Sequence, residues 1–237
     1  MRCNNSRVVL AIIVLLCSLA GHRALALDPS CPKLDVPLAA LLMPPPKHDS
    51  AQTKAELDEL VRLQELRTSD QVKHAKEDDH RTLERFLGGI GIKVENLSAS
   101  AKSFFDCIGD SVREATHEVK GTFMRTRPYR LPHNKLHILK TPSDRDSSSY
   151  PSVHATYGAA VGLVLAEIIP EKKEAIYRRI HDYAYSRLLS GVHFRSEIYA
   201  GEIAGVAIAA SLMNKEAFRD QLKDVRAELR KTIGITP

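Results

Sequence analysis

The C-terminal half of the chain carries three helical segments in close succession, and two of them are apolar on nearly all sides. We expect helices from Ser152 to about Ile168, from Glu171 to about Leu189, and from about Arg195 to Met213. The first and third have the composition of helices that are buried in a core. Because no useful length of the chain alternates apolar and polar residues as a strand does, the sequence predicts an all-α fold, a single-domain helical bundle.

Further helices are expected around a long irregular segment. Residues 125–150 contain three prolines and a run of three serines, which is typical of a loop, and long loops in compact domains are often functional. Apolar residues at helical spacing predict the remaining helices, in chain order from Ala51 with Asp49 or Ser50 as the cap, from Ser69 towards Phe86 and Leu87, around Ala101–Ile108, at Ser111–Lys120 and at Glu216–Lys231.

The N-terminus has the features of an export signal. Residues 1–26 begin with Arg2 and Arg7, continue with the apolar run Val8–Ala20, and end in Ala24-Leu25-Ala26, a small-x-small cleavage site. The apolar run has about 13 residues, whereas a membrane-spanning helix needs about 20. We therefore expect a signal peptide that is removed, a periplasmic or secreted protein, and no stable membrane span after cleavage. An uncleaved anchor is the alternative.

The mature chain is expected to begin with a proline-rich arm. Residues 27–50 hold six prolines, so they are predicted to be extended, in front of a helical domain at residues 51–237. The formal net charge of +5 belongs partly to the signal, since residues 1–26 hold three arginines and no acidic residue, and it becomes +2 without them. A nucleic-acid partner is therefore not expected.

Two cysteines, Cys31 and Cys107, remain after removal of the signal. An even pair in an exported chain favours a disulfide bond that ties the arm to the helical domain. The alternative is two separate thiols, with Cys107 simply buried beside Phe104 and Phe105.

The start of the predicted helix at Ser152 has the features of an anion site. Ser152 follows Pro151 and precedes a long apolar run, as an N-cap residue does. The free N–H groups of a first helical turn, with the helix dipole behind them, bind anions. Ser152 taken alone can be merely a cap, but His154 places an imidazole in the same turn. An anion bound there would lie within reach of that ring.

A second histidine is paired in the sequence with a carboxylate. Gly191 is expected to break the preceding helix, and His193 to open or precede the next one. Glu197 lies four residues further on and would fall beside His193 in a helix. A carboxylate that accepts from Nδ1–H fixes the tautomer and leaves Nε2 as a free lone pair, which prepares a nucleophile. An ordinary surface pair of His and Glu is the alternative.

Two cations precede the loop. Lys120 and Arg127 lie seven residues apart, with Pro128 after the arginine, and they could bring an ammonium and a guanidinium to one phosphate group. Taken alone, such a pair is more often part of a solvated loop. No metal is expected at His193 and Glu197, because no third ligand lies at a recognisable spacing and three nearby cations would repel the ion.

Taken together, these motifs resemble the signature of the type 2 phosphatidic acid phosphatase (PAP2) superfamily. The signature runs Lys, six residues, Arg-Pro; then Pro-Ser-x-His; then Ser-Arg, five residues, His. The soluble exported class A non-specific acid phosphatases of bacteria are the most similar members. The likeness covers nearly all of the mature chain, including the proline-rich arm, Tyr150, the segment Leu165–Ile168 and the segment Ala227–Leu229.

The resemblance implies a role for each motif residue. His193 would attack phosphorus and form a phosphohistidine, Glu197 would orient it, and His154 would protonate the leaving alkoxide and then activate water. The phosphate oxygens would be bound by Lys120, Arg127, Ser152, the backbone N–H of Val153, and Arg187. Phosphate monoesters would be the substrates, phosphate and vanadate inhibitors, and no cofactor would be needed. The sequence does not indicate the oligomeric state.

Two positions depart from the family pattern. The family usually has Gly at Val153 and Asp at Glu197. The valine can crowd the pocket, and the extra methylene of the glutamate can misalign its contact with His193. We expect an active enzyme whose rate these departures can lower. The alternatives are a catalytically impaired homologue that binds phosphate without turnover and a vanadate-dependent haloperoxidase, which shares this anion pocket.

Overall fold

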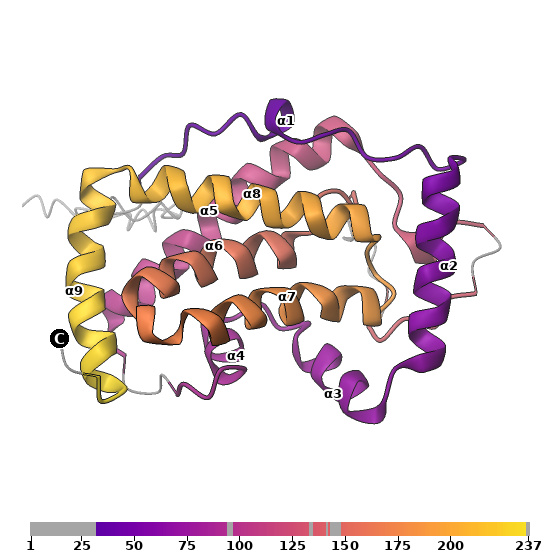
Figure 1. Ribbon diagram of the computed structural model, residues 1–237. Helices are drawn as coiled ribbons and strands as arrows, with labels where there is room; N and C mark the ends of the chain where they lie inside the picture. Colours follow the sequence, from indigo (N-terminus) through magenta and orange to yellow (C-terminus); the bar gives the residue numbers. More distant parts are fainter. Residues whose placement is uncertain (1–31, 94–96, 133–134, 141, 143–147, 236–237) are drawn as a thin grey trace, which may run out of the picture.

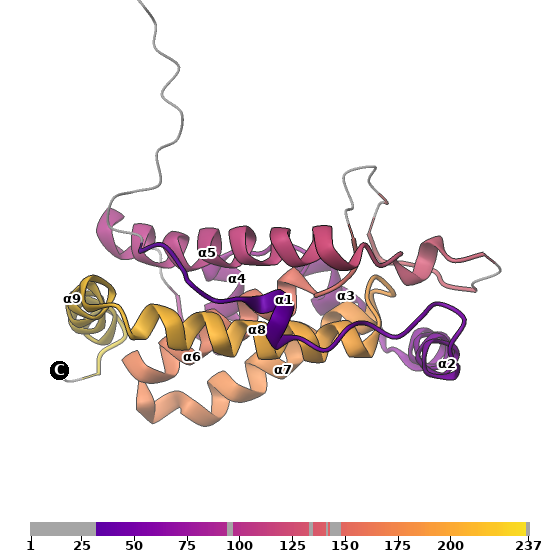
Figure 2. The same ribbon diagram turned by 90° about the horizontal axis from the view of Figure 1, so that it is seen from above.

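The computed structural model describes residues 32–93, 97–132, 135–140, 142 and 148–235. This part of the chain is helical and includes no strand, which confirms the all-α prediction. The long helices α5 (Ala99–Phe123), α6 (Val153–Ile168), α7 (Lys173–Leu189) and α8 (Arg195–Met213) form the body of the bundle (Figure 1). Figures 1 and 2 show α9 (Glu216–Thr232) at one end of this bundle and α2 (Ala51–Leu66) at the other.

The C-terminal helices agree closely with the sequence-based expectations. Ser152 caps α6, α8 spans the expected residues, and α9 ends one residue later than expected. A short 3-10 turn, η2 (Pro170–Lys172), precedes α7. In the N-terminal half, Ser50 rather than Asp49 caps α2, since its hydroxyl accepts the N–H of Thr53.

The helix expected from Ser69 to Leu87 is instead two helices, α3 (Ser69–Glu77) and α4 (Leu83–Gly88). The chain leaves the first at Asp78, whose buried carboxylate receives both guanidinium nitrogens of Arg179 on α7, at 2.7 and 3.0 Å. Thr82 then caps the second helix. The prediction of one helix was therefore wrong because a tertiary ion pair, invisible to local spacing, ends it.

The opposite error occurred in the next segment, where two helices were expected and the single helix α5 is found. Gly109 lies inside it and does not interrupt it. A Cβ atom at this position would meet the Tyr157 ring at an ordinary contact distance of 3.6 Å. Beyond the helix, the described part of the loop contains only the short turn η1 (Pro128–Arg130).

From residue 32 onwards the proline-rich arm is extended except for the four-residue helix α1 (Leu38–Leu41), which the sequence did not predict. Leu38 and Leu42 anchor the arm in the core. The predicted signal at residues 1–26 and Cys31 lie outside the described residues. Cys107 is buried on α5 and takes part in a disulfide bond. Its pairing with Cys31 stays a prediction.

Glycines bring α6 and α8 into close contact, and this contact positions the site. A Cβ atom at Gly201 would lie 2.6 Å from the backbone oxygen of Ser152 and 2.9 Å from the Cβ of Ala155. Gly205 meets the next turn of α6 in the same way, against the backbone oxygen of Thr156. The N–H of Ser152 also donates to the backbone oxygen of Glu197 at 3.1 Å. The N-termini of the two helices are thus held side by side.

Substitution of Gly205 by alanine tests this packing. The new methyl group would meet backbone atoms that cannot turn aside, so we expect Gly205→Ala to destabilise the fold by about 1–3 kcal/mol. Gly109→Ala is the matched control, because it adds a methyl group inside a helix without a clash and should stabilise by about 0.5–1 kcal/mol. Urea unfolding of both variants measures the difference. Equal stabilisation by both would show that the helices can separate freely.

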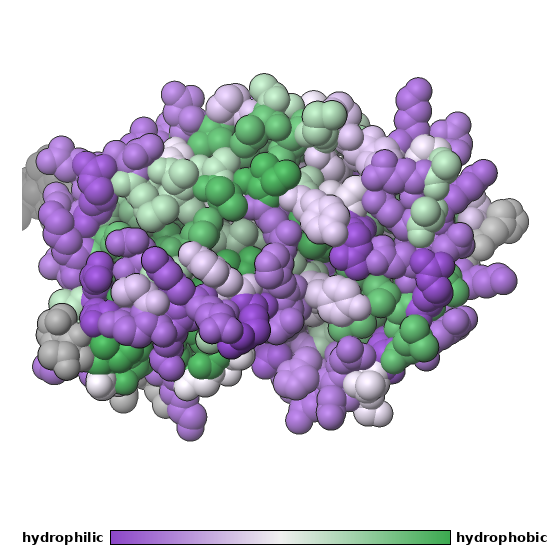
Figure 3. All heavy atoms as spheres, viewed as in Figure 1, coloured by the Kyte–Doolittle hydropathy of each residue, from purple (hydrophilic) through white to green (hydrophobic). Residues whose placement is uncertain are grey.

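Helix α8 has one further property. In the described part of the chain it is the one helix long and apolar enough to cross a membrane by length and composition, and half of its apolar window is buried inside the bundle. Its outward side exposes Tyr199, Ile203 and Val206. Figure 3 shows hydrophobic residues gathered over this face (Figure 3). The predicted absence of a membrane span stays a prediction.

Candidate active site

The predicted site residues come together where α6 and α8 begin. Ser152, Val153 and His154 form the start of α6, and His193 lies two residues before α8, which carries Glu197. The other three predicted residues approach from neighbouring elements: Lys120 from the last turn of α5, Arg127 from the segment just before η1, and Arg187 from the last turn of α7.

His193 and Glu197 form a buried dyad. Nδ1 of His193 lies 2.8 Å from Oε2 of Glu197, and the two residues are 3% and 0% exposed, which excludes a surface pair. Oε2 also accepts from the hydroxyl of Ser149 at 2.5 Å and from the N–H of Phe194 at 3.1 Å. An ionised carboxylate can only accept hydrogen bonds, so Nδ1 carries the imidazole proton when Glu197 is ionised. Nε2 is therefore the ring nitrogen that carries the free lone pair.

The loop turns at Gly191 to place His193 there. Gly191 has a φ of +71°, in the left-handed region that favours glycine, so it reverses the chain after α7. The ring of His193 then lies against Arg127, whose Nη1 is 3.2 Å from Nε2 and donates to the backbone oxygen of Val192 at 3.1 Å. The lone pair of Nε2 thus faces a guanidinium.

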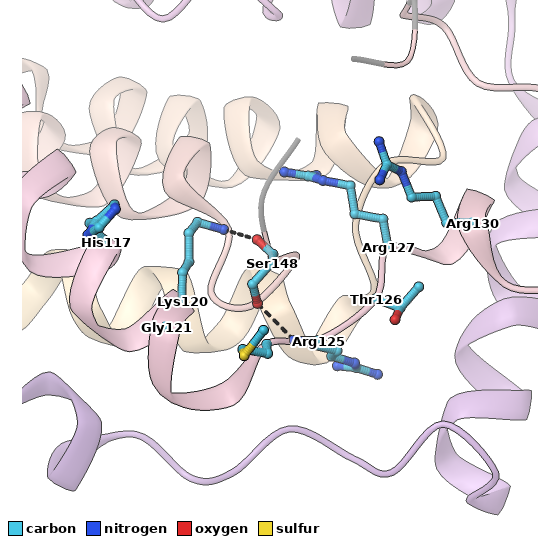
Figure 4. A pocket seen from close by; sticks show the side chains of 9 residues that line it. His117, Lys120, Gly121, Arg125, Thr126, Arg127, Arg130 and Ser148 are labelled. Atoms are coloured by element: carbon cyan, nitrogen blue, oxygen red, sulfur yellow. Dashed lines mark hydrogen bonds between the residues drawn. The ribbon is translucent and has the colours of Figure 1, made fainter. Parts of the chain in front are cut away.

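Lys120 and Arg127 line one cavity of about 440 Å³ (Figure 4). Figure 4 shows the ammonium of Lys120 directed at the backbone oxygen of Ser148, to which it donates a hydrogen bond. Lys120 is 8% exposed, so it is not a solvated loop residue. The two cations are thus held at one hollow of the surface, which Arg125 also lines, whereas neither His154 nor His193 is among its lining residues.

The first turn of α6 contains Ser152, Val153 and the imidazole of His154. The hydroxyl of Ser152 is buried and accepts the N–H of Ala155 at 3.4 Å. Val153 is the first helical residue, and its side chain packs against the core. Nε2 of His154 lies 3.1 Å from the backbone oxygen of Asp79, and its ring lies near Tyr183, with 6.0 Å between centroids.

Arg187 is held by several partners. Its side chain is 1% exposed, Nη1 donates to Oδ1 of Asp79 at 2.7 Å, and Nη2 donates to the backbone oxygen of Ala75 at 2.7 Å. Nε donates to the hydroxyl of Ser186 at 3.1 Å. Among the described residues, these partners take three of the five N–H donors of the guanidinium. Asp79 therefore orients Arg187 and offsets its charge.

Burial and the surrounding cations control the ionisation of both imidazoles. Burial lowers the pKa of His193 well below its usual value, and the charges of Arg127 and Lys120 lower it further. Burial likewise lowers the pKa of His154, with Arg187 as the next cause. Both rings are thus neutral near pH 7. A bound phosphate dianion would offset the cations and move each pKa back upwards.

The buried carboxylate responds in the opposite sense. Burial raises the pKa of Glu197 to about 7, although the charge of Arg125 and the hydrogen bond from Ser149 act against this rise. Neither of these two residues was identified in the sequence, nor was Asp79. Arg125 could have been noticed as a third cation between Lys120 and Arg127. Nothing local marks Ser149 or Asp79, because their partners lie 44 to 108 residues away.

Comparison with known proteins identifies the family of the chain. The PAP2 superfamily model matches residues 108–220, a stretch that includes every predicted catalytic and phosphate-binding residue. Over 198 residues the chain is 30% identical to a non-specific acid phosphatase of Salmonella typhimurium, covering 79% of this chain and 78% of the relative. The chain belongs to the PAP2 superfamily.

Two other relatives support the same assignment to PAP2. A non-specific acid phosphatase of Providencia stuartii is 29% identical over 205 residues, covering 81% of this chain and 80% of the relative. An acid phosphatase of Zymomonas mobilis is 37% identical over 95 residues, covering 38% of this chain and 36% of the relative. The sequence-based identification of the superfamily is confirmed, and so is the prediction of an enzyme of the acid phosphatase class.

Proposed function

We propose that this PAP2 protein hydrolyses phosphate monoesters through a phosphohistidine on His193, without a metal ion, and that it acts after export from the cytoplasm. One observation carries the proposal: the imidazole of His193 is buried, its Nδ1 is tied to Glu197, and its Nε2 lone pair faces Arg127. Export is supported by the sequence of residues 1–26.

In the first step Nε2 of His193 forms a bond to phosphorus while the bond from phosphorus to the ester oxygen breaks. His154 gives a proton to the leaving alkoxide. Lys120, Arg127 and Arg187 would neutralise the oxygens of the transferring phosphoryl group, together with the start of α6 at Ser152 and Val153. Phosphoryl transfer needs little more than positioning and charge stabilisation, which these groups supply.

In the second step water replaces the histidine. Neutral His154 takes a proton from the water as its oxygen bonds to phosphorus, and the bond from Nε2 to phosphorus breaks. His193 returns to its starting form and phosphate leaves. Because the first step needs His154 protonated and the group's pKa is lowered by burial and by Arg187, activity should decline as the pH rises above that lowered value. Since His193 must be neutral to attack phosphorus while His154 must be charged, an acid-to-neutral optimum and a bell-shaped profile are expected.

The proposed function is tested with purified mature protein and p-nitrophenyl phosphate in EDTA. Phosphate release that vanadate inhibits is the expected result. No release between pH 4 and 8, with phosphate still bound, would favour the impaired homologue. Activity that EDTA removes and zinc restores would contradict a metal-independent reaction. Oxidation of bromide by the vanadate-loaded protein and peroxide would instead indicate a haloperoxidase.

His154→Ala tests the role of the leaving-group acid. Alkyl phosphates need a proton on the departing oxygen, so their kcat/KM should fall about 10²- to 10⁴-fold, whereas p-nitrophenyl phosphate, whose phenolate leaves unaided, should lose much less. A series of aryl and alkyl phosphates measures the dependence on leaving-group pKa, which should steepen in the variant. Equal losses across the series would contradict the assignment.

A further inference from the structure

Arg125 is a buried cation that lies against the dyad of His193 and Glu197 and also lines the cavity of Lys120 and Arg127. It is 3% exposed, and Figure 4 shows its guanidinium turned away from Lys120 and Arg127. Its guanidinium carbon lies 4.3 Å from the centre of the ring of Phe194, which is the residue between His193 and the start of α8. A buried arginine needs compensating partners, because an uncompensated buried charge costs several kcal/mol. Those partners show what it does.

One partner is Glu197 itself. Nε of Arg125 lies 3.4 Å from Oε1 of Glu197, and within the described residues neither atom has a hydrogen bond. Oε2 is saturated by His193, Ser149 and Phe194, so Oε1 is the side of the carboxylate that a proton could occupy. Arg125 is the cation placed against that side.

The other partners fix Arg125 from a distant helix. Nη1 donates to the hydroxyl of Ser196 at 2.8 Å, and Nη2 lies 3.4 Å from both Oγ1 of Thr53 and Oε2 of Glu56, on α2. Glu56 in turn accepts the N–H of Ser196 at 3.1 Å and its hydroxyl at 2.9 Å. The first turn of α8 is thereby attached to α2 through Glu56 and Arg125.

We propose that Arg125, held in place by Glu56, is a positioning residue for the reaction: it favours the ionised form of Glu197 and directs this carboxylate at Nδ1 of His193. The proposal rests on the phosphohistidine mechanism above. When Nε2 attacks phosphorus, the ring becomes positively charged, and a carboxylate at Nδ1 stabilises that charge. Glu56 offsets the charge of Arg125, which leaves the charge of Glu197 available to the imidazolium.

The sign of the pH effect follows from the charges around Glu197. The charged groups that face it are Arg125, with Glu56 behind, then Arg127 and His193, and Tyr150 lies close by as a neutral phenol. Removing Arg125 takes away the largest of the influences that lower the pKa of Glu197. The carboxyl then keeps its proton to a higher pH. Removing the charge of Glu56 leaves Arg125 to act fully on Glu197, which has the opposite effect.

The test is the pH dependence of kcat/KM for p-nitrophenyl phosphate in Arg125→Met and Glu56→Gln. We expect Arg125→Met to lose about 10- to 100-fold in kcat near pH 7, where the Glu197 carboxyl of the wild-type protein is partly ionised, with KM little changed, and its acid limb to move to higher pH. The limb of Glu56→Gln should move to lower pH. Arg125→Lys, which keeps the charge, should restore most of the wild-type limb. If the acid limbs of Arg125→Met and Glu56→Gln moved in the same direction, or if neither moved, the proposal would be overturned.

Arg195→Met is the matched control for docking of α2. Arg195 joins α8 to α2 through Glu59, with Nε at 2.7 Å from Oε1, and has no contact with Glu197. Loss of this pair should lower stability without moving the acid limb. Nitrogen-15 NMR of the histidine rings gives a readout that does not depend on turnover. Loss of the Nδ1–H form of His193 in Arg125→Met is expected, and its retention would contradict the positioning role even if the wild-type protein released no phosphate.

Discussion

His193→Ala is expected to abolish turnover, with a loss in kcat of about 10⁴-fold or more. The ring supplies the lone pair that attacks phosphorus, with Nε2 at 3.2 Å from Nη1 of Arg127, and an alanine side chain has no atom that can replace it. The phosphoenzyme seen after a rapid denaturing quench of wild-type protein with labelled substrate should disappear in the variant. Substrate affinity should change far less, because the cations that bind phosphate are retained.

Two controls make this result specific. His154→Ala with p-nitrophenyl phosphate should still form the phosphoenzyme and should retain it for longer, because the base that activates water is missing. His193→Gln fills more of the space left by the ring and guards against collapse of the buried site. Thermal unfolding of both His193 variants checks the fold. A labelled protein in His193→Ala would show that another residue accepts the phosphoryl group.

The dyad could be predicted from sequence because its geometry is local. The four-residue spacing predicted that His193 and Glu197 would meet, and they do at 2.8 Å, although His193 precedes α8 and does not lie inside it. The same holds for the capping of α6 by Ser152 and for the long apolar helices, whose burial is visible in their composition. In each of these cases the interaction lies within a few residues along the chain.

The interactions that the sequence did not reveal join residues far apart. Asp78 ends α3 because it pairs with Arg179, 101 residues later, and Arg125 contacts Thr53 and Glu56 about 70 residues earlier. No periodicity or spacing encodes such pairs. They depend on how α2 and α7 dock, which is decided by packing of the whole bundle. The motif residues were therefore predictable, whereas the residues that orient them were not.

Glu197→Gln should produce the second largest loss, about 10²- to 10⁴-fold in kcat. The amide is nearly the same size but neutral, and as a donor it can impose the wrong tautomer on His193, an effect of about 10⁴ in serine-protease triads. Ser149 and the N–H of Phe194 would also compete for the remaining amide oxygen. A loss in kcat with nearly unchanged KM and Tm is expected. Unchanged kcat would show that the carboxylate only fills space.

Glu197→Asp separates charge from reach. The structure shows that the longer side chain suits this site, since Glu197 is completely buried and meets Nδ1 at hydrogen-bond distance. Asp, although usual in the family, would draw the carboxylate back by about 1.5 Å, and a misplacement of about 1 Å can cost on the order of 100-fold in rate. We therefore expect Asp at this position to slow the enzyme, and kcat of the two variants side by side measures it. A faster Asp variant would show that α8 can shift towards His193, against the close contact of Gly201 and Gly205 with α6.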